Sequence, residues 1–83
     1  MNIQVRYFAS VREALGVGER VEAGEGSSVA ALRDALVARG GVYAEAMGRG
    51  RVLRAARNRT MCDEATPLQD GDEVGFFPPV TGG

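Results

Sequence analysis

The chain has no histidine and no lysine, and its one cysteine is Cys62. Without histidine there is no Ser-His or Cys-His catalytic dyad, and one cysteine excludes an intramolecular disulfide and a Cys/His zinc site. Without lysine no side-chain amine forms a Schiff base or accepts an isopeptide bond. A lone cysteine is more often a small apolar filler than a sulfur relay. The chain is therefore not expected to be an enzyme on its own.

Long apolar runs and a strong charge of one sign are also missing. No run approaches the roughly 18 to 20 apolar residues that span a bilayer, and residues 1–6 alternate polar and apolar, unlike a signal peptide. The formal net charge is −1, so neither nucleic acid nor a membrane is an expected partner. Eighty-three residues allow one domain. We expect a single-domain cytoplasmic protein.

The charges that are present are segregated along the chain. All ten basic residues are arginine, and those between Arg49 and Arg59 precede a run of acidic residues between Asp63 and Glu73. We interpret these two runs as a solvated surface whose charges compensate one another.

Apolar periodicity predicts the helices and strands. Alternation predicts a strand over residues 2–7, and the Ser10–Glu13 spacing of a capping box predicts a short helix over 10–15. The main helix is expected to begin at Ser27 or Ser28, with Arg33 off its apolar stripe, and to end at the glycines 40–41. The other expected elements are a return strand over 19–23, a helical turn over 42–47, strands over 52–58 and 73–77, and a loop or short strand over 59–68.

This order of elements predicts an α+β fold, a ubiquitin-like β-grasp roll. One main helix packs on one face of a small mixed sheet, and a right-handed crossover lets the first and last strands lie parallel as neighbours. The predicted β-grasp domain covers residues 1–77, and residues 78–83 form a flexible C-terminal tail that ends in Gly-Gly.

The tail has a chemistry of its own. Pro78 and Pro79 cannot donate to a sheet and must end the last strand, while Gly82 and Gly83 lack Cβ atoms and can enter a narrow tunnel. The reactive group is the α-carboxylate of Gly83. A carboxylate can attack the α-phosphate of ATP to give an acyl-adenylate, and a sulfur donor can then displace AMP to leave a thiocarboxylate.

At this point the chain resembles a known family. Residues 70–83 read DGDEVGFFPPVTGG, residues 7–13 read YFASVRE, and residues 56–59 read ARNR. Together with the main helix these segments resemble the MoaD-type small, sulfur-carrying subunit of molybdopterin synthases. The resemblance implies that Gly83 is adenylated and converted to a thiocarboxylate. The tail, with Val80, Thr81 and Gly82, then enters the large synthase subunit, where sulfur passes to a cyclic pterin precursor to form the molybdopterin dithiolene.

The resemblance also implies partners. These are the large subunit, in a heterotetramer of two small and two large chains, an E1-like adenylating enzyme that uses ATP, and a sulfurtransferase or cysteine desulfurase as the sulfur source. No cofactor is expected on this chain itself. By resemblance, Phe8, Arg12, Met61 and Phe77 face the partner enzymes.

Strand parity adds an independent argument for two of these residues. Phe8 and Phe77 have the opposite parity to the apolar residues of their strands, so they are expected on the helix-free face as an exposed aromatic patch at the root of the tail. The alternative is that Phe8 has left the strand and packs under the short helix.

Three other functions remain open from the sequence. The chain could be a sulfur carrier for thiazole or cysteine synthesis, a ubiquitin-like protein modifier, or a non-covalent β-grasp adaptor. The insertion at residues 9–16 and the FFPPVT segment favour the molybdopterin type.

Overall fold

The structure, a computed structural model, describes residues 1–79. Its elements follow one another in the order β1 (Asn2–Tyr7), α1 (Ala9–Leu15), β2 (Gly18–Glu22), α2 (Val29–Val37), α3 (Gly41–Met47), β3 (Arg54–Arg57), β4 (Thr60–Cys62) and β5 (Glu73–Phe77). No helix within this described part is long and apolar enough to cross a membrane.

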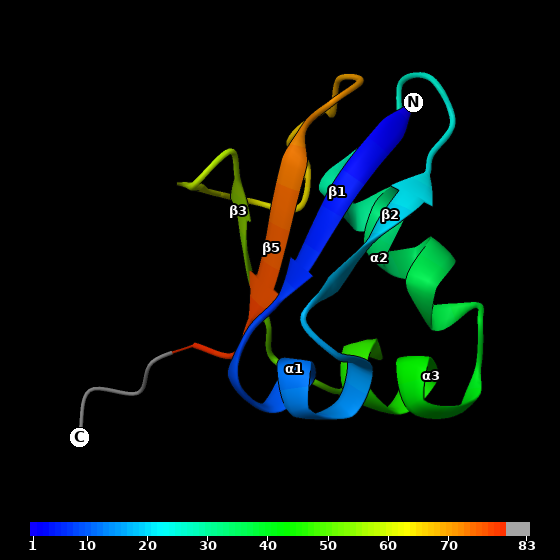
Figure 1. Cartoon of the computed structure of the whole chain (residues 1–83), viewed down its shortest axis with the longest axis vertical. Helices are drawn as coiled ribbons and strands as arrows, with labels where there is room; N and C mark the ends of the chain where they lie inside the picture. The colour runs from blue at the N-terminus through cyan, green and yellow to red at the C-terminus, as the bar shows by residue number, and fades with distance from the viewer. Residues whose placement is uncertain (80–83) are drawn as a thin grey trace.

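The five strands form one mixed sheet in the order β2-β1-β5-β3-β4. The first and last strands, β1 and β5, are parallel neighbours in the centre, and the other pairs are antiparallel. Figure 1 shows β1 and β5 side by side in front of α2, with α1 and α3 near the end of the sheet where both strands finish. The predicted α+β roll is confirmed.

The core lies between the sheet and its helices. Every second residue of β1 is buried, as alternation predicts for a strand with one covered face. These side chains pack against apolar residues of α1, α2, α3, β2, β3 and β5. The fully buried large side chains are Ile3, Val5, Tyr7, Val29, Leu32, Leu36, Met47, Val74 and Phe76.

Helix α2 is the main helix that the sequence predicts. Ser28 is its N-cap, and the Ser28 hydroxyl accepts a hydrogen bond of 3.2 Å from the backbone N–H of Ala31. The prediction that Arg33 lies off the buried stripe is wrong, because its residue surface is only 3% exposed. Apolar spacing could not show this, since burial of Arg33 depends on partners from α3, the loop after it and Glu64.

The short helix α1 begins differently from the prediction. Its N-cap is Phe8, without a side-chain hydrogen bond, so the capping box from Ser10 to Glu13 is wrong. Ala9 instead takes a positive φ of 53°, which costs a non-glycine residue about 1 kcal/mol or more. This sharp turn lets the chain leave β1 for α1 immediately after Phe8.

The second half of the sheet is shorter than expected. The strand predicted over 52–58 is limited to Arg54–Arg57, because Asn58 and Arg59 take positive φ values of 50° and 69° in the turn to β4. Of the two possibilities for residues 59–68, the short strand is present at its start as β4.

Candidate docking face and tail exit

The aromatic pair at the end of β1 and β5 is held by the parallel register of these two strands. Tyr7 is opposite Phe76, and the backbone N–H of Phe8 donates to the carbonyl of Phe76 at 3.1 Å. Phe8, which directly follows β1, and Phe77, the last residue of β5, therefore lie on the side of the sheet that the helices leave open. Their rings meet edge to face, with centroids 6.3 Å apart and planes at 83°.

Phe8 lies against the open face of the sheet. An ideal Cβ built on Gly75 would lie 2.9 Å from Cε2 of the Phe8 ring, so the ring packs directly over this glycine. The Arg6 guanidinium carbon is 5.8 Å from the centroid of the same ring. Phe8 is nevertheless 41% exposed. It packs on the open face, so the alternative in which it packs under α1 is wrong.

Met61 shares this face with the aromatic pair. In the sheet register Met61 is opposite Ala56, which is in turn opposite Gly75. Residues in one such cross-strand row point to the same side of a sheet. Met61 is 56% exposed. We call the surface formed by Phe8, Met61 and Phe77 the docking face.

Arg12 is placed apart from the strands, on α1. It is exposed, and no hydrogen bond or ion pair of its side chain occurs within residues 1–79. The structure therefore puts Arg12 near the end of the sheet where β1 finishes, on the helix that follows the docking face. Its predicted contact with a partner enzyme stays a prediction.

The tail leaves the sheet beside the docking face. Phe77 is the last residue of β5, and Pro78 and Pro79 follow it, both half-buried. The predicted tail residues Val80, Thr81, Gly82 and Gly83 lie outside the described residues. The proline pair thus follows directly on Phe77 of the docking face.

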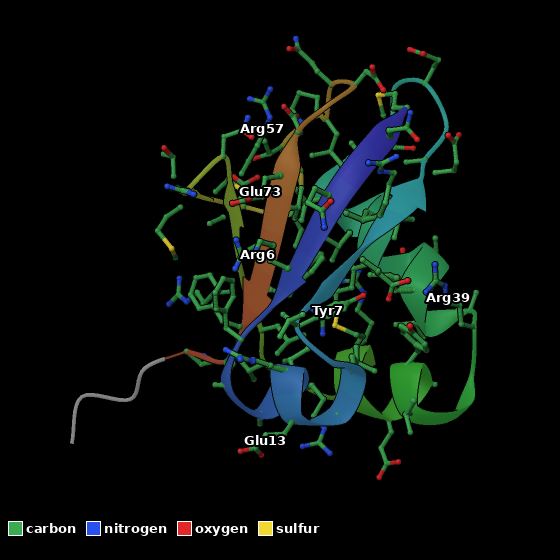
Figure 2. All side chains as sticks on the ribbon, viewed as in Figure 1. Arg6, Tyr7, Glu13, Arg39, Arg57 and Glu73 are labelled. Atoms are coloured by element: carbon green, nitrogen blue, oxygen red, sulfur yellow. The ribbon has the colours of Figure 1, made fainter. Side chains whose placement is uncertain are left out.

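Charged side chains on the open face form loose pairs. Arg6 Nη1 lies 3.9 Å from Glu73 Oε2, and Arg59 Nε lies 3.8 Å from Glu73 Oε1. Figure 2 shows Arg6 and Glu73 beside β5 on the near side of the sheet. Such exposed pairs contribute little to stability. They leave the apolar docking face bordered by charge.

Tighter ionic contacts lie on the helix side. Glu19 of β2 accepts hydrogen bonds from Tyr7 Oη at 2.9 Å, Tyr43 Oη at 2.7 Å and Arg39 Nη1 at 2.6 Å. Burial acts to raise the pKa of the Glu19 carboxyl, but these three donors together lower it. Burial, and then the bond to Glu19, raises the pKa of the Tyr7 hydroxyl. This cluster ties β1, β2 and α3 together.

The buried side chain of Arg33 forms a second polar cluster, after that of Glu19, which the sequence did not predict. Its Nε donates to the carbonyl of Met47, and its Nη2 donates to the carbonyls of Gly48 and Arg51, each at 2.8 Å. Its Nη1 donates to Glu64 Oε2 at 2.9 Å. Arg33 therefore fixes the end of α3 and the loop after it to α2.

The remaining charges agree with the interpretation of a compensating surface. Arg49 pairs with Asp34 at 2.8 Å and also with Glu64, and Arg57 Nε pairs with Asp72 Oδ2 at 2.6 Å. Cys62 is half-buried and packs against the core, as expected for an apolar filler. In the described part of the chain no three His, Cys, Asp or Glu side chains are grouped so that they could hold a metal ion.

Fold and site define a class of protein. It is a small β-grasp domain in which exposed Phe8 and half-buried Phe77 form an edge-to-face pair, and the last strand continues into Pro78 and Pro79. The ThiS family model matches residues 5–83, and the chain belongs to the ThiS family. It is 46% identical over 81 residues to the molybdopterin synthase sulfur carrier subunit of Escherichia coli (strain K12), covering 98% of this chain and 99% of the relative.

Solved structures agree with this assignment. SAMP1 from Haloferax volcanii superposes with a TM-score of 0.78 at 25% identity, with all of both chains covered. A chain of the complex of subunits 1 and 2 of molybdopterin-converting factor from Helicobacter pylori superposes with a TM-score of 0.70 at 31% identity, again over all of both chains.

Proposed function

We infer that this chain is the sulfur carrier subunit of a molybdopterin synthase. The observation that carries the inference is the exit of β5 beside the docking face, into a segment that the family match follows through Gly83. The full-length relative from Escherichia coli, a molybdopterin synthase sulfur carrier subunit, supports this function over a carrier for thiazole or cysteine synthesis.

The proposed chemistry takes place at the α-carboxylate of Gly83. This carboxylate attacks the α-phosphate of ATP on an E1-like adenylating enzyme, and pyrophosphate leaves. The persulfide of a sulfurtransferase or cysteine desulfurase then attacks the acyl-adenylate and displaces AMP. A thiol cleaves the resulting acyl disulfide, which leaves the thiocarboxylate on Gly83 and a disulfide on the donor. This chain contributes the acyl group and the surface that the enzymes bind, and binds no cofactor itself.

The carrier in its thiocarboxylate form then delivers sulfur to the large synthase subunit. In this proposal the docking face binds the large subunit while Val80, Thr81 and Gly82 enter its active site, where a cyclic pterin precursor receives sulfur and becomes the molybdopterin dithiolene. The complex of two subunits from Helicobacter pylori supports such a partner. We propose a cytoplasmic heterotetramer of two small and two large chains.

Intact mass spectrometry of the protein purified from its own cells tests the carrier chemistry. A population of chains should be heavier by the difference between one sulfur and one oxygen atom. Deleting Gly83, or adding one alanine after it, should abolish this population and leave the circular dichroism spectrum unchanged. Sulfur loading of a chain with the added alanine would disprove the mechanism, and mass adducts on lysines of other proteins would indicate a modifier instead.

A second variant tests how the tail is used. Gly82→Val adds a branched Cβ that obstructs a narrow channel and restricts φ. It should leave the fold intact and reduce sulfur transfer in the presence of the large subunit. Gly24→Ala, at an exposed glycine before α2 whose φ is not positive, is a control outside the tail. Normal turnover of Gly82→Val would show that the tail does not pass through a narrow channel.

A further inference from the structure

A groove of about 460 Å³ lies on the other side of the tail exit from the docking face, between α1, α3 and the loop over residues 50–53. Pro78 lines its edge. Its deeper part is apolar, formed by Val11, Ala46 and Leu53, of which Val11 is buried in the core. Its rim carries two exposed valines, Val42 (55% exposed) and Val52 (74% exposed).

Several apolar side chains of residues 1–79 are exposed. The large ones are Phe8, Val17, Val42, Val52 and Met61. Phe8 and Met61 belong to the docking face, Val42 and Val52 line the groove, and Val17 lies beside a smaller hollow at Gly18. Pro78, which directly follows Phe77, connects the docking face with the groove. The groove therefore begins where the docking face and the tail meet.

The walls of the groove are fixed before any partner binds. Arg33 holds the carbonyls of Met47, Gly48 and Arg51, so the segment between α3 and Val52 is bonded to the buried side of α2. Arg51 Nε also donates to the carbonyl of Glu45 at 3.1 Å. A preformed surface loses little entropy on binding and is suited to a lasting contact.

The docking face alone is small for a stable complex. A stable interface buries roughly 800 Å² on each partner. Three side chains, of which Phe8 and Met61 are about half exposed and Phe77 is half-buried, supply less than half of that area. In the proposed complex the tail adds further buried area. Because Pro78 begins the tail and also lines the groove, a partner that encloses the tail from its first residue must lie over the edge of the groove.

We propose that this groove is a second contact with the large synthase subunit, and that it receives an apolar side chain of the same protein that takes the tail. The inference rests on the proposed function. The two contacts, on opposite sides of Pro78, would fix the direction in which the tail leaves the domain. Because adenylation is a transient encounter, the adenylating enzyme is not expected to need the groove.

Val52→Asp and Val42→Asp test the groove. Both side chains are exposed, and an aspartate in the first turn of α3 suits the helix dipole, so both variants should fold. Ala65→Asp is the matched control, because it adds the same charge to an exposed loop residue outside the groove and docking face. The measurements are affinity for the purified large subunit by titration calorimetry, rate of adenylation, and thermal unfolding.

We expect Val52→Asp to weaken binding to the large subunit at least tenfold, and Val42→Asp to weaken it by a smaller factor. Neither variant should change the rate of adenylation or the thermal unfolding. Ala65→Asp should match the unmodified chain. Unchanged affinity of both valine variants, or an equal loss of adenylation, would overturn the groove proposal. Phe77→Ala, measured alongside, separates the two proposals: if it weakens binding while the valine variants do not, the carrier function stands without the groove.

Discussion

The two faces of the sheet are built from alternate residues of the same strands, and they differ in what covers them. On one face Val5, Tyr7 and Phe76 are buried under the helices. On the other, Phe8 and Phe77 lie next to one another with no helix above them. Because side chains alternate along a strand, a shift of one residue would exchange the two sets. Residue parity therefore separates the side chains that form the core from those of the docking face.

Polar contacts follow the same division. On the covered side, Arg33 and Glu19 each bind several partners at 2.6 to 2.9 Å. On the open side, Arg6 and Glu73 approach only to 3.9 Å. Short hydrogen bonds hold the helices to one another and to β2, whereas the ion pairs on the open face are loose.

The largest expected effect is on the covered face. Phe76→Ala removes a ring that is almost fully buried and should lower the free energy of unfolding by about 3 to 5 kcal/mol. Chemical denaturation followed by circular dichroism measures it. Phe77→Ala is the neighbouring control and should be much less destabilising. If the two results were exchanged, the register of β5 would be off by one residue.

Truncating the buried arginine comes next. Arg33→Ala leaves the carbonyls of Met47, Gly48 and Arg51 without their charged donor and should cost about 2 to 4 kcal/mol of stability by the same measurement. Arg33→Lys keeps the charge but cannot reach several carbonyls at once, so it should recover only part of the loss. Full recovery by lysine would show that the charge, not the fork of donors, is what matters.

On the open face the expected effect is on binding. Phe77→Ala should weaken the complex with the large subunit by about 30-fold, equivalent to about 2 kcal/mol, with little change in thermal stability. Titration calorimetry measures the affinity. Thr60→Ala, on the exposed edge strand β4, is a control that removes a smaller side chain. An unchanged affinity for Phe77→Ala would mean that the docking face is not an interface.

The smallest effect concerns pH. The pKa of Glu19 is lowered in the folded state, so its contribution to stability is complete above the unfolded value of about 4.5 and is lost as the pH falls through the folded value. Glu64 and Asp72 have lowered pKa values too and act in the same direction. The free energy of unfolding should therefore decrease as the pH falls below about 4.5. Glu19→Gln should reduce that slope, and an unchanged slope would show that the Glu19 cluster does not contribute.

Much of the fold could be predicted because its signals are local. Alternation in residues 2–7, the N-cap at Ser28 and the proline pair after Phe77 each fix a short stretch of backbone without help from distant residues. The start of α1 could not be predicted in this way. The sequence has the spacing of a capping box at Ser10. The helix nevertheless begins where the positive φ of Ala9 and the backbone hydrogen bond from Phe8 to Phe76 turn the chain out of the sheet.

By itself the sequence determined the order of the elements, the parity that separates Phe76 from Phe77, and the chemistry available to Gly83. Only the tertiary structure decided that Met61 shares a face with Phe8 and Phe77, that Phe8 does not pack under α1, that Arg33 is buried, and that a groove adjoins Pro78. The physical reason is the distance along the chain over which each effect acts. Periodicity and capping act between residues a few positions apart, whereas burial of a charge and the shape of a surface depend on which distant segments the parallel pairing of β1 and β5 brings together.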